Sequence, residues 1–168
     1  MQQLTLYTNQ ATDTKHSWKM VSDQVMGGIS QGIMQTTENG VNLQGRVSLK
    51  NNGGFLQVQW QLSNSISQTE LQSYRGIFIE WCSQKNEELE LLLKSAQLWM
   101  PWQSYRCKAT ATPEWQMLYI PFELFQPYRT QTRLNPKRIN KFSVLAGGKE
   151  MDVNVTIRQF GFFKSPTK

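Results

Sequence analysis

Apolar and polar residues alternate through the stretch VNLQGRVSLKNNGGFLQVQWQL, residues 41–62. Residues 41–49 place valine and leucine side chains on one face, and residues 55–62 repeat the pattern. Alternation with a period of two predicts β-strands that bury one face. The connection between them, residues 50–54, is rich in Asn and Gly, which accept positive φ angles, so we expect a tight turn there.

Segments of the same kind follow along the chain, and together they predict about eight strands. They are residues 76–82, 89–93, 105–110, 115–120, 142–145 and 153–163. Helix signals are limited to single turns at 67–71, where Ser67 and Glu70 have capping-box spacing, and at 122–125. Many short strands with almost no helix predict an all-β sandwich of the jelly-roll type. With no internal repeat or linker, residues 1–168 are expected to form a single domain.

The chain carries a net charge of +6, but only 18% of its residues are charged. Its basic residues are spread along the sequence. Nucleic-acid-binding patches usually gather their charge on one face, so we interpret the densest basic group as a solvated rim and do not expect a nucleic-acid partner. That group consists of Arg129, Arg133, Lys137, Arg138 and Lys141.

The sequence has no features of an export or membrane segment. Residues 1–18 lack the basic and apolar regions of a signal peptide and the Arg-rich pattern of a transit peptide. No apolar stretch approaches the roughly 20 residues that cross a membrane. We therefore expect a cytoplasmic protein without membrane insertion. Cys82 and Cys107 are then expected to be reduced, half-buried thiols, although a disulfide between facing strands is the alternative.

Residues suited to catalysis are few. His16 is the single histidine and has only Asp13 nearby, so a catalytic triad or a zinc site lacks partners. Glu80 and Glu90 lie on predicted strands that could be neighbours, but alternation directs both toward solvent. The aspartates are too scattered for a calcium site. We expect no enzymatic activity, no metal and no cofactor.

One segment, WKMVSDQVMGGIS at residues 18–30, does not have an ordinary strand or turn pattern. Asp23 is suited to accept backbone hydrogen bonds, and Ser30 can close a second local hydrogen bond. The glycine pair between them allows unusual backbone angles. These residues predict a buried, hydrogen-bonded loop packed under Trp18 and Met26.

Residues 23–30, DQVMGGIS, closely resemble the DxVMGGxS signature of the complex I intermediate-associated protein 30 family. Further blocks match in order over roughly residues 18–163: LQG at 43–45, VSL at 47–49, NGGF at 52–55, YRGI at 74–77, WQSYR at 102–106, WQ at 115–116, IPF at 120–122 with Phe125, and PKRI at 136–139.

The resemblance implies a jelly-roll sandwich similar to galactose-binding-like domains. It also implies a non-catalytic assembly factor or chaperone, with subunits of a respiratory complex or another redox complex as its protein partners. The chain departs from the family at residues 127–131, where a longer loop is common, so its partner can differ.

A carbohydrate- or small-ligand-binding module is the alternative function. Trp99, Trp102, Tyr105 and Arg106 could line a concave sheet face, because aromatic rings stack on sugars. An exposed Trp99 beside Arg106 and Gln103 would favour this alternative. Against it, Trp102 and Trp115 are also suited to anchor the core. Binding of RNA would require stacking aromatics within a basic face.

The candidate ligand- or partner-binding residues combine the motif loop with aromatic and basic positions. Asp23 would order its loop, and Arg75 or Arg106 could pair with it or with an acidic ligand. The alternative is a buried polar network that only stabilises the sandwich. The set is Asp23, Met26, Gly28, Ser30, Asn52, Gly53, Arg75, Trp99, Gln103, Tyr105 and Arg106.

Overall fold

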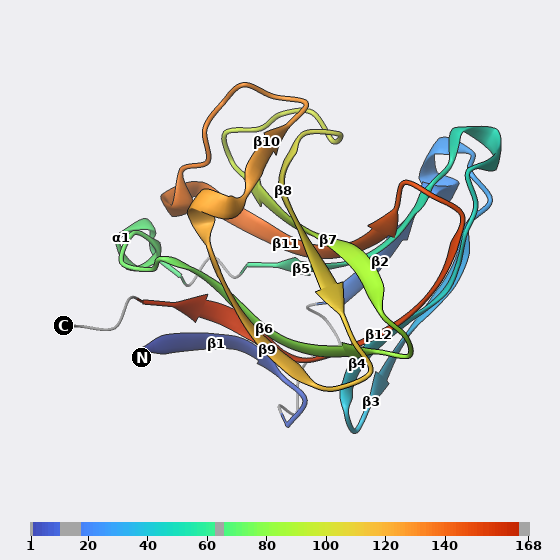
Figure 1. Ribbon diagram of the computed structural model, residues 1–168. Coiled ribbons are helices and arrows are strands. Elements are labelled where there is room, and N and C mark those ends of the chain that lie inside the picture. Colours follow the sequence, from blue (N-terminus) through green and yellow to red (C-terminus); the bar gives the residue numbers. More distant parts are fainter. Residues whose placement is uncertain (1, 11–17, 63–65, 165–168) are drawn as a thin grey trace.

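Figure 1 shows the computed structural model of the protein, which describes residues 2–10, 18–62 and 66–164. Within these residues, antiparallel strands form two six-stranded sheets that pack face to face, which confirms the predicted all-β jelly-roll sandwich. The strands are β1 (Gln3–Thr8), β2 (Trp18–Ser22), β3 (Gln31–Thr37), β4 (Gly40–Val47), β5 (Phe55–Gln61), β6 (Gly76–Ser83), β7 (Glu87–Ser95), β8 (Ser104–Ala111), β9 (Gln116–Pro121), β10 (Gln126–Tyr128), β11 (Ile139–Gly147) and β12 (Met151–Phe163).

The two sheets differ in how their strands are ordered. Sheet A has the order β3-β4-β12-β6-β9, with β1 also paired to β12. Strand β12 pairs with β6 on one side, and on the other it pairs first with β4 and then with β1. Sheet B has the order β10-β8-β7-β11-β5-β2. In both sheets, many strands pair with strands that are distant in the sequence.

The stretch at residues 41–62 forms β4, a 3-10 turn η2 (Lys50–Asn52) and β5. Asn51 and Asn52 have φ angles of 58° and 60°, which confirms the predicted turn with positive φ. The turn carries the chain from sheet A to sheet B, because β4 pairs with β3 and β12 whereas β5 pairs with β11 and β2. One alternating stretch therefore contributes to both layers of the core.

Aromatic side chains fill the space between the sheets. The ring centroids of Trp18 and Trp60 are 5.2 Å apart, and Phe142 stacks on Phe160 at 4.6 Å. Tyr7 packs edge-on against Trp18. Aromatic side chains bury about 150–250 Å² each, so this cluster supplies much of the apolar burial that a chain with a modest apolar fraction needs.

In the part of the chain that the structure describes, helical structure is limited to single turns, as predicted. Helix α1 (Gln68–Leu71) is capped by the Ser67 hydroxyl, which accepts from the Glu70 amide at 3.1 Å. The other turns are the 3-10 segments η1 (Asp23–Met26), η3 (Phe122–Leu124) and η4 (Pro136–Arg138). No helix in the described ranges is long and apolar enough to cross a membrane.

The two cysteines lie in different sheets. Cys82 is on β6 of sheet A and Cys107 is on β8 of sheet B, and both are half-buried, free thiols. Burial raises the pKa of each thiol above its ordinary value. A raised pKa lowers the fraction of reactive thiolate near neutral pH.

Candidate binding face

Asp23 is the centre of a buried hydrogen-bond cluster that joins two loops. Its carboxylate accepts from the Ser30 amide at 3.1 Å and from the Ser30 hydroxyl. It also accepts from the amides of Gly54 at 2.6 Å and Phe55 at 3.2 Å, where β5 begins. We call Asp23, Ser30, Gly54 and Phe55 the Asp23 clamp. Through the Asp23 clamp, the η1 loop is tied to the start of β5 in sheet B.

These donors stabilise the ionised form of the Asp23 carboxyl. Burial raises the pKa of the Asp23 carboxyl, but the hydrogen bonds from Ser30, Gly54 and Phe55 outweigh it and hold the pKa below its ordinary value. Two glycines leave room for the carboxylate. A Cβ at Gly28 would lie 2.5 Å from Cγ of Asp23, and a Cβ at Gly53 would lie 2.6 Å from its Oδ2.

The predicted hydrogen-bonded loop is therefore present, but the expectation that it is buried is wrong for most of it, because residues 24–27 and 29 are exposed. Asp23 and Ser30 are fully buried, whereas the Met26 side chain is 61% exposed and does not cover them. Val25 is 74% exposed beside it. Asn52 lies in the adjacent η2 turn. This arrangement agrees with the expectation of a buried polar network, and it leaves Asp23 itself out of reach of a partner.

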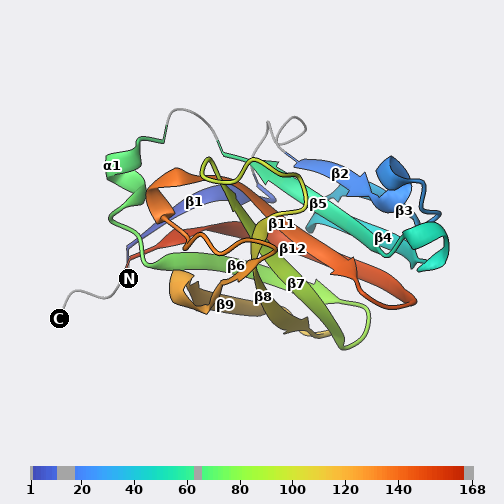
Figure 2. The ribbon, with the colours of Figure 1, turned by 90° about the horizontal axis from the view of Figure 1, so that it is seen from above.

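The side of sheet B that faces away from sheet A is called the outer face of sheet B. In Figures 1 and 2, no described helix or strand lies over it. Its floor is nevertheless almost inaccessible: Leu92, Ser143 and Leu145 are buried, and Gln57 is 8% exposed. A floor this well buried without a covering layer indicates that surrounding side chains and loops rise above it.

Loops rise at both ends of this face. In Figure 1 the connections after β7 and β10 stand above sheet B at one end, and the η1 and η2 turns stand at the other. The loop after β7 carries Trp99, which is 89% exposed, and Trp102, which is 57% exposed. Gln103 anchors this loop, because its amide donates to the Arg129 carbonyl at 3.3 Å.

Charged and aromatic side chains are arranged on the face itself. The Arg106 guanidinium pairs with Glu90 at 2.8 Å and lies 3.6 Å from the ring centroid of Tyr128. Lys94 and Lys141 are opposite each other in the β7–β11 ladder. Burial, followed by the nearby charges of Lys141 and Arg106, lowers the pKa of Lys94.

The exposed basic residues are also concentrated in space. The segment from Arg129 to Arg138 packs beside the loop after β7, because Gln97 donates to the Arg133 carbonyl at 3.1 Å and accepts from the Asn135 amide at 3.0 Å. The densest basic group of the sequence therefore lies at one end of sheet B, where two loops distant in sequence meet. Arg129, Arg133, Lys137 and Arg138 are exposed there, as expected for a solvated rim.

Several expected site residues lie elsewhere. Tyr105 is fully buried and points to the core, so it lies behind the face that its neighbour Arg106 occupies. Arg75 is exposed at the start of β6 in sheet A and neither arginine pairs with Asp23. Trp102 does not anchor the core, and Trp115 is half-buried outside it, where the guanidinium of Arg158 lies 3.7 Å from its ring.

The arrangement also shows residues that the sequence did not single out. Lys94, Gln57 and Tyr128 lie on the outer face of sheet B, together with Lys141 of the predicted basic group. The period-two pattern of β7 contained part of the signal, because it places Glu90 and Lys94 on the side opposite its core leucines. No comparable signal in the sequence places β11 beside β7.

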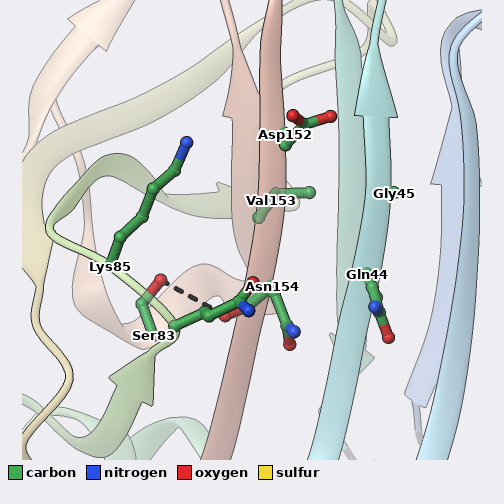
Figure 3. A pocket seen from close by; sticks show the side chains of 8 residues that line it. Gln44, Gly45, Ser83, Lys85, Asp152, Val153 and Asn154 are labelled. Carbon is green, nitrogen blue, oxygen red and sulfur yellow. Dashed lines mark hydrogen bonds between the residues drawn. The ribbon is translucent and has the colours of Figure 1, made fainter.

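A separate hollow lies in sheet A, where β4, β12 and the β6–β7 turn meet (Figure 3). The cavity has a volume of about 360 Å³. The Ser83 hydroxyl donates to the Asn154 carbonyl at 3.2 Å, and the side chains of Lys85 and Asp152 do not converge on it (Figure 3). This hollow therefore lacks a nucleophile with an adjacent base.

The described residues also offer no paired acids or metal cluster. Glu80 is on β6 of sheet A and Glu90 is on β7 of sheet B, so the two carboxylates lie in different sheets and do not form a dyad. Within 2–10, 18–62 and 66–164, no group of three His, Cys, Asp or Glu side chains is placed to hold a metal ion. His16 and Asp13 lie outside the described residues.

Comparisons with known proteins give both a family and a fold. The family model for complex I intermediate-associated protein 30 (CIA30) matches residues 7–157. A search of curated protein sequences finds no match.

Solved structures with a similar fold include carbohydrate-binding modules. A family 11 module from Clostridium thermocellum, solved with a β-1,3-1,4-mixed-linked tetrasaccharide, has 12% identity and a TM-score of 0.77 over 99% of this chain and 98% of that chain. A family 30 module of a cellulosomal cellulase from the same organism has 10% identity and a TM-score of 0.64, over 99% and 100% of the two chains. At such low identity these similarities establish the fold alone.

Proposed function

The chain belongs to the complex I intermediate-associated protein 30 family, and from this premise we propose that it is a non-catalytic binding protein that assists the assembly of a respiratory or other redox complex. The outer face of sheet B and the loop after β7 are the partner-binding surface in this proposal. Family membership supports the assembly role, and the geometry of the face supports its location.

The pair of exposed tryptophans, Trp99 and Trp102, is the observation that carries this location. Large apolar side chains gathered on a surface mark interaction sites, and Trp is enriched among residues that dominate binding energy. The loop that carries them is tied down by Gln103 to Arg129 and by the Lys94 ammonium to the Pro101 carbonyl. A tethered loop presents both rings with little ordering cost on binding.

The proposal predicts that the double variant Trp99→Ala/Trp102→Ala loses its partner. In a crosslinked pull-down from the native host at physiological salt, we expect the wild type to enrich subunits or biogenesis factors of a respiratory complex and the variant to lose most of that enrichment. Stability should change little, because exposed substitutions usually alter the free energy of unfolding by no more than about 0.5 kcal/mol.

A matched control is the double variant Val25→Ala/Met26→Ala, which removes two apolar side chains that are also more than half exposed, at the other end of the outer face of sheet B. It should keep the partner. Loss of the partner in this control but not in the tryptophan variant would move the binding surface to the η1 loop. Absence of any respiratory or redox-complex protein from the wild-type pull-down would refute the assembly role.

A carbohydrate ligand is the second candidate function, favoured by one specific observation. The exposed Trp99 lies in the same loop as Gln103. The outer face of sheet B, which adjoins this loop, carries Arg106, Tyr128 and the amide of Gln57. Aromatic rings beside amide side chains suit a sugar, which has apolar faces and hydroxyl edges.

Titration with a panel of soluble glucans by isothermal calorimetry tests this second function. If the face binds sugars, a glucan should bind the wild type and the Val25→Ala/Met26→Ala control. The tryptophan double variant should lose about 1–3 kcal/mol of binding free energy, the order found when a nucleic-acid base stacks on an aromatic side chain. No heat with any glucan would leave the protein-binding proposal as the single function of this face.

A further inference from the structure

Three cationic side chains meet on one end of the outer face of sheet B. Lys94 and Lys141 are directly opposite in the β7–β11 ladder. Arg106 is opposite Leu92 in the β7–β8 ladder, which places it one diagonal step from Lys94 on the same face. Like charges directly opposite each other destabilise a sheet. The Lys94–Lys141 pair is therefore expected to lower the stability of the sheet, so the need to fold does not explain its presence.

Only one of the three cations is neutralised within the described part of the chain. Glu90 pairs with Arg106 at 2.8 Å, and no described carboxylate lies within ion-pair distance of Lys94 or Lys141. The Lys94 ammonium donates to a neutral acceptor, the Pro101 carbonyl. Burial, followed by the nearby charges of Lys141 and Arg106, lowers the pKa of Lys94, as expected for an ammonium without a described carboxylate partner. Bound carboxylates would relieve this repulsion.

The floor of the same face contains an unused acceptor nearer the η2 turn, opposite Leu145 and so four residues along β11 from Lys141. Oε1 of Gln57 is buried and has no hydrogen-bond partner, and the side chain is 8% exposed. An unpaired buried acceptor is destabilising unless a donor reaches it. An extended polypeptide advances about 3.3 Å per residue, so one acidic segment can place carboxylates at the cations and a backbone N–H near Gln57. Apolar side chains of the same segment also suit the exposed rings of Trp99 and Trp102, which favours an acidic polypeptide.

We propose that the outer face of sheet B, from the loop after β7 to Gln57, binds an extended, acidic segment of a partner protein. Carboxylates of the segment contact Lys94 and Lys141, a backbone N–H donates to Gln57, and apolar side chains of the segment pack on Trp99 and Trp102. The exposed basic residues from Arg129 to Arg138 add long-range attraction around the site. This inference rests on the proposed protein-binding function and specifies the chemistry of its partner.

A short oligoglutamate peptide flanked by leucine is a suitable probe. Its affinity for the full chain is measured by quenching of tryptophan fluorescence at low and at physiological salt. We expect Lys141→Gln to weaken binding about fivefold to tenfold, the order expected when one partner of a close charge pair is lost. Its melting temperature should stay the same or rise, because the like-charge pair is removed. Lys94→Gln is a second variant with the same expected loss of affinity.

Lys50→Gln is the matched control, because it removes the same charge from the η2 turn at the other end of the face. It should keep its affinity for the peptide. Equal affinity of Lys141→Gln, Lys94→Gln and the wild type would overturn the inference, and so would failure of the wild type to bind the peptide. Tighter binding of an oligouridylate or of polygalacturonate would overturn it in favour of a nucleic acid or an acidic glycan.

These outcomes are separable from the assembly proposal. If the tryptophan-dependent pull-down succeeds while the oligoglutamate peptide does not bind, the partner is a protein and its acidic character is refuted. If the peptide binds through Lys141 but no redox-complex protein is recovered, the chemistry of the face stands and the assembly role fails.

Discussion

Replacement of Asp23 with alanine is expected to lower the free energy of unfolding by about 3–4 kcal/mol, because it leaves buried donors without an acceptor and each fully buried one costs about 1–3 kcal/mol. The donors are the amide and hydroxyl of Ser30 and the amides of Gly54 and Phe55. The total stays below four full penalties because the amides of Gly54 and Phe55 are only partly buried and the Ser30 hydroxyl can still donate to the Ser48 carbonyl. Chemical unfolding in urea, followed by tryptophan fluorescence, measures the loss. The slope with denaturant should stay unchanged, since the same surface is exposed on unfolding.

Asp152→Ala is the control for the Asp23 result, because Asp152 is exposed and forms only a surface pair with Arg46 at 3.5 Å. Its effect should stay within about 0.5 kcal/mol. The lowered pKa of Asp23 gives a second readout. The stability that it contributes is fully present above the ordinary pKa of an aspartate and is lost as the pH falls through the folded-state pKa. The difference between wild type and Asp23→Ala should therefore narrow in acid.

One result would reverse this interpretation of the clamp. An Asp23→Ala protein with wild-type stability and no partner binding would show that the carboxylate acts on a partner instead of on its own loop.

Substitution of Gly28 with alanine is expected to cost about 2–3 kcal/mol, in the range of overpacking in a tight core. The new Cβ would meet Asp23 at Cγ and Oδ1, both 2.5 Å away, and at Cβ, 2.8 Å away. The clamp would have to shift or lose hydrogen bonds. Thermal unfolding monitored by circular dichroism, together with urea unfolding, measures the effect.

The same clash predicts that Gly28→Ala and Asp23→Ala are not additive. In the Asp23→Ala background two of the three close atoms are gone, so Gly28→Ala should cost less than it does in the wild type. A double-mutant cycle gives the coupling directly. Equal costs in both backgrounds would mean that Gly28 is restricted by something other than the carboxylate. Gly27→Ala is a different test, because its φ of 88° strains any side chain although nothing lies near its Cβ.

Much of the fold follows from local sequence patterns. The alternation at residues 41–62 predicts β4, β5 and the turn between them, and the Asn-rich turn has the positive φ angles that its composition favours. Strands β1, β2, β3 and β10 were not predicted. Strand β10 has three residues, and β3 is an edge strand with little buried surface, so neither leaves a strong apolar period.

The candidate site was less accessible from the sequence, for two separate reasons. Tyr105 and Arg106 are consecutive in one strand and point to opposite sides, so alternation alone excludes placing both on one face. The pairing of Lys94 with Lys141 is a different case. It depends on β11 lying beside β7, which is a matter of sheet order that no local pattern encodes. The Asp23 clamp could be predicted in part. The sequence indicates its loop and Ser30, but it does not indicate that the donors Gly54 and Phe55 come from a different segment.

The position of β12 has a consequence for how the chain is made. This strand is inserted between β6 on one side and β4 and β1 on the other, with Phe163 opposite Gln3. It is also the last described strand to leave the ribosome. Until then, sheet A has no central strand, and the edges of β4 and β6 remain open to pairing with other chains. Native sheet A therefore forms after synthesis of β12, and a nascent chain stalled before residue 151 is the form of this protein most exposed to aggregation.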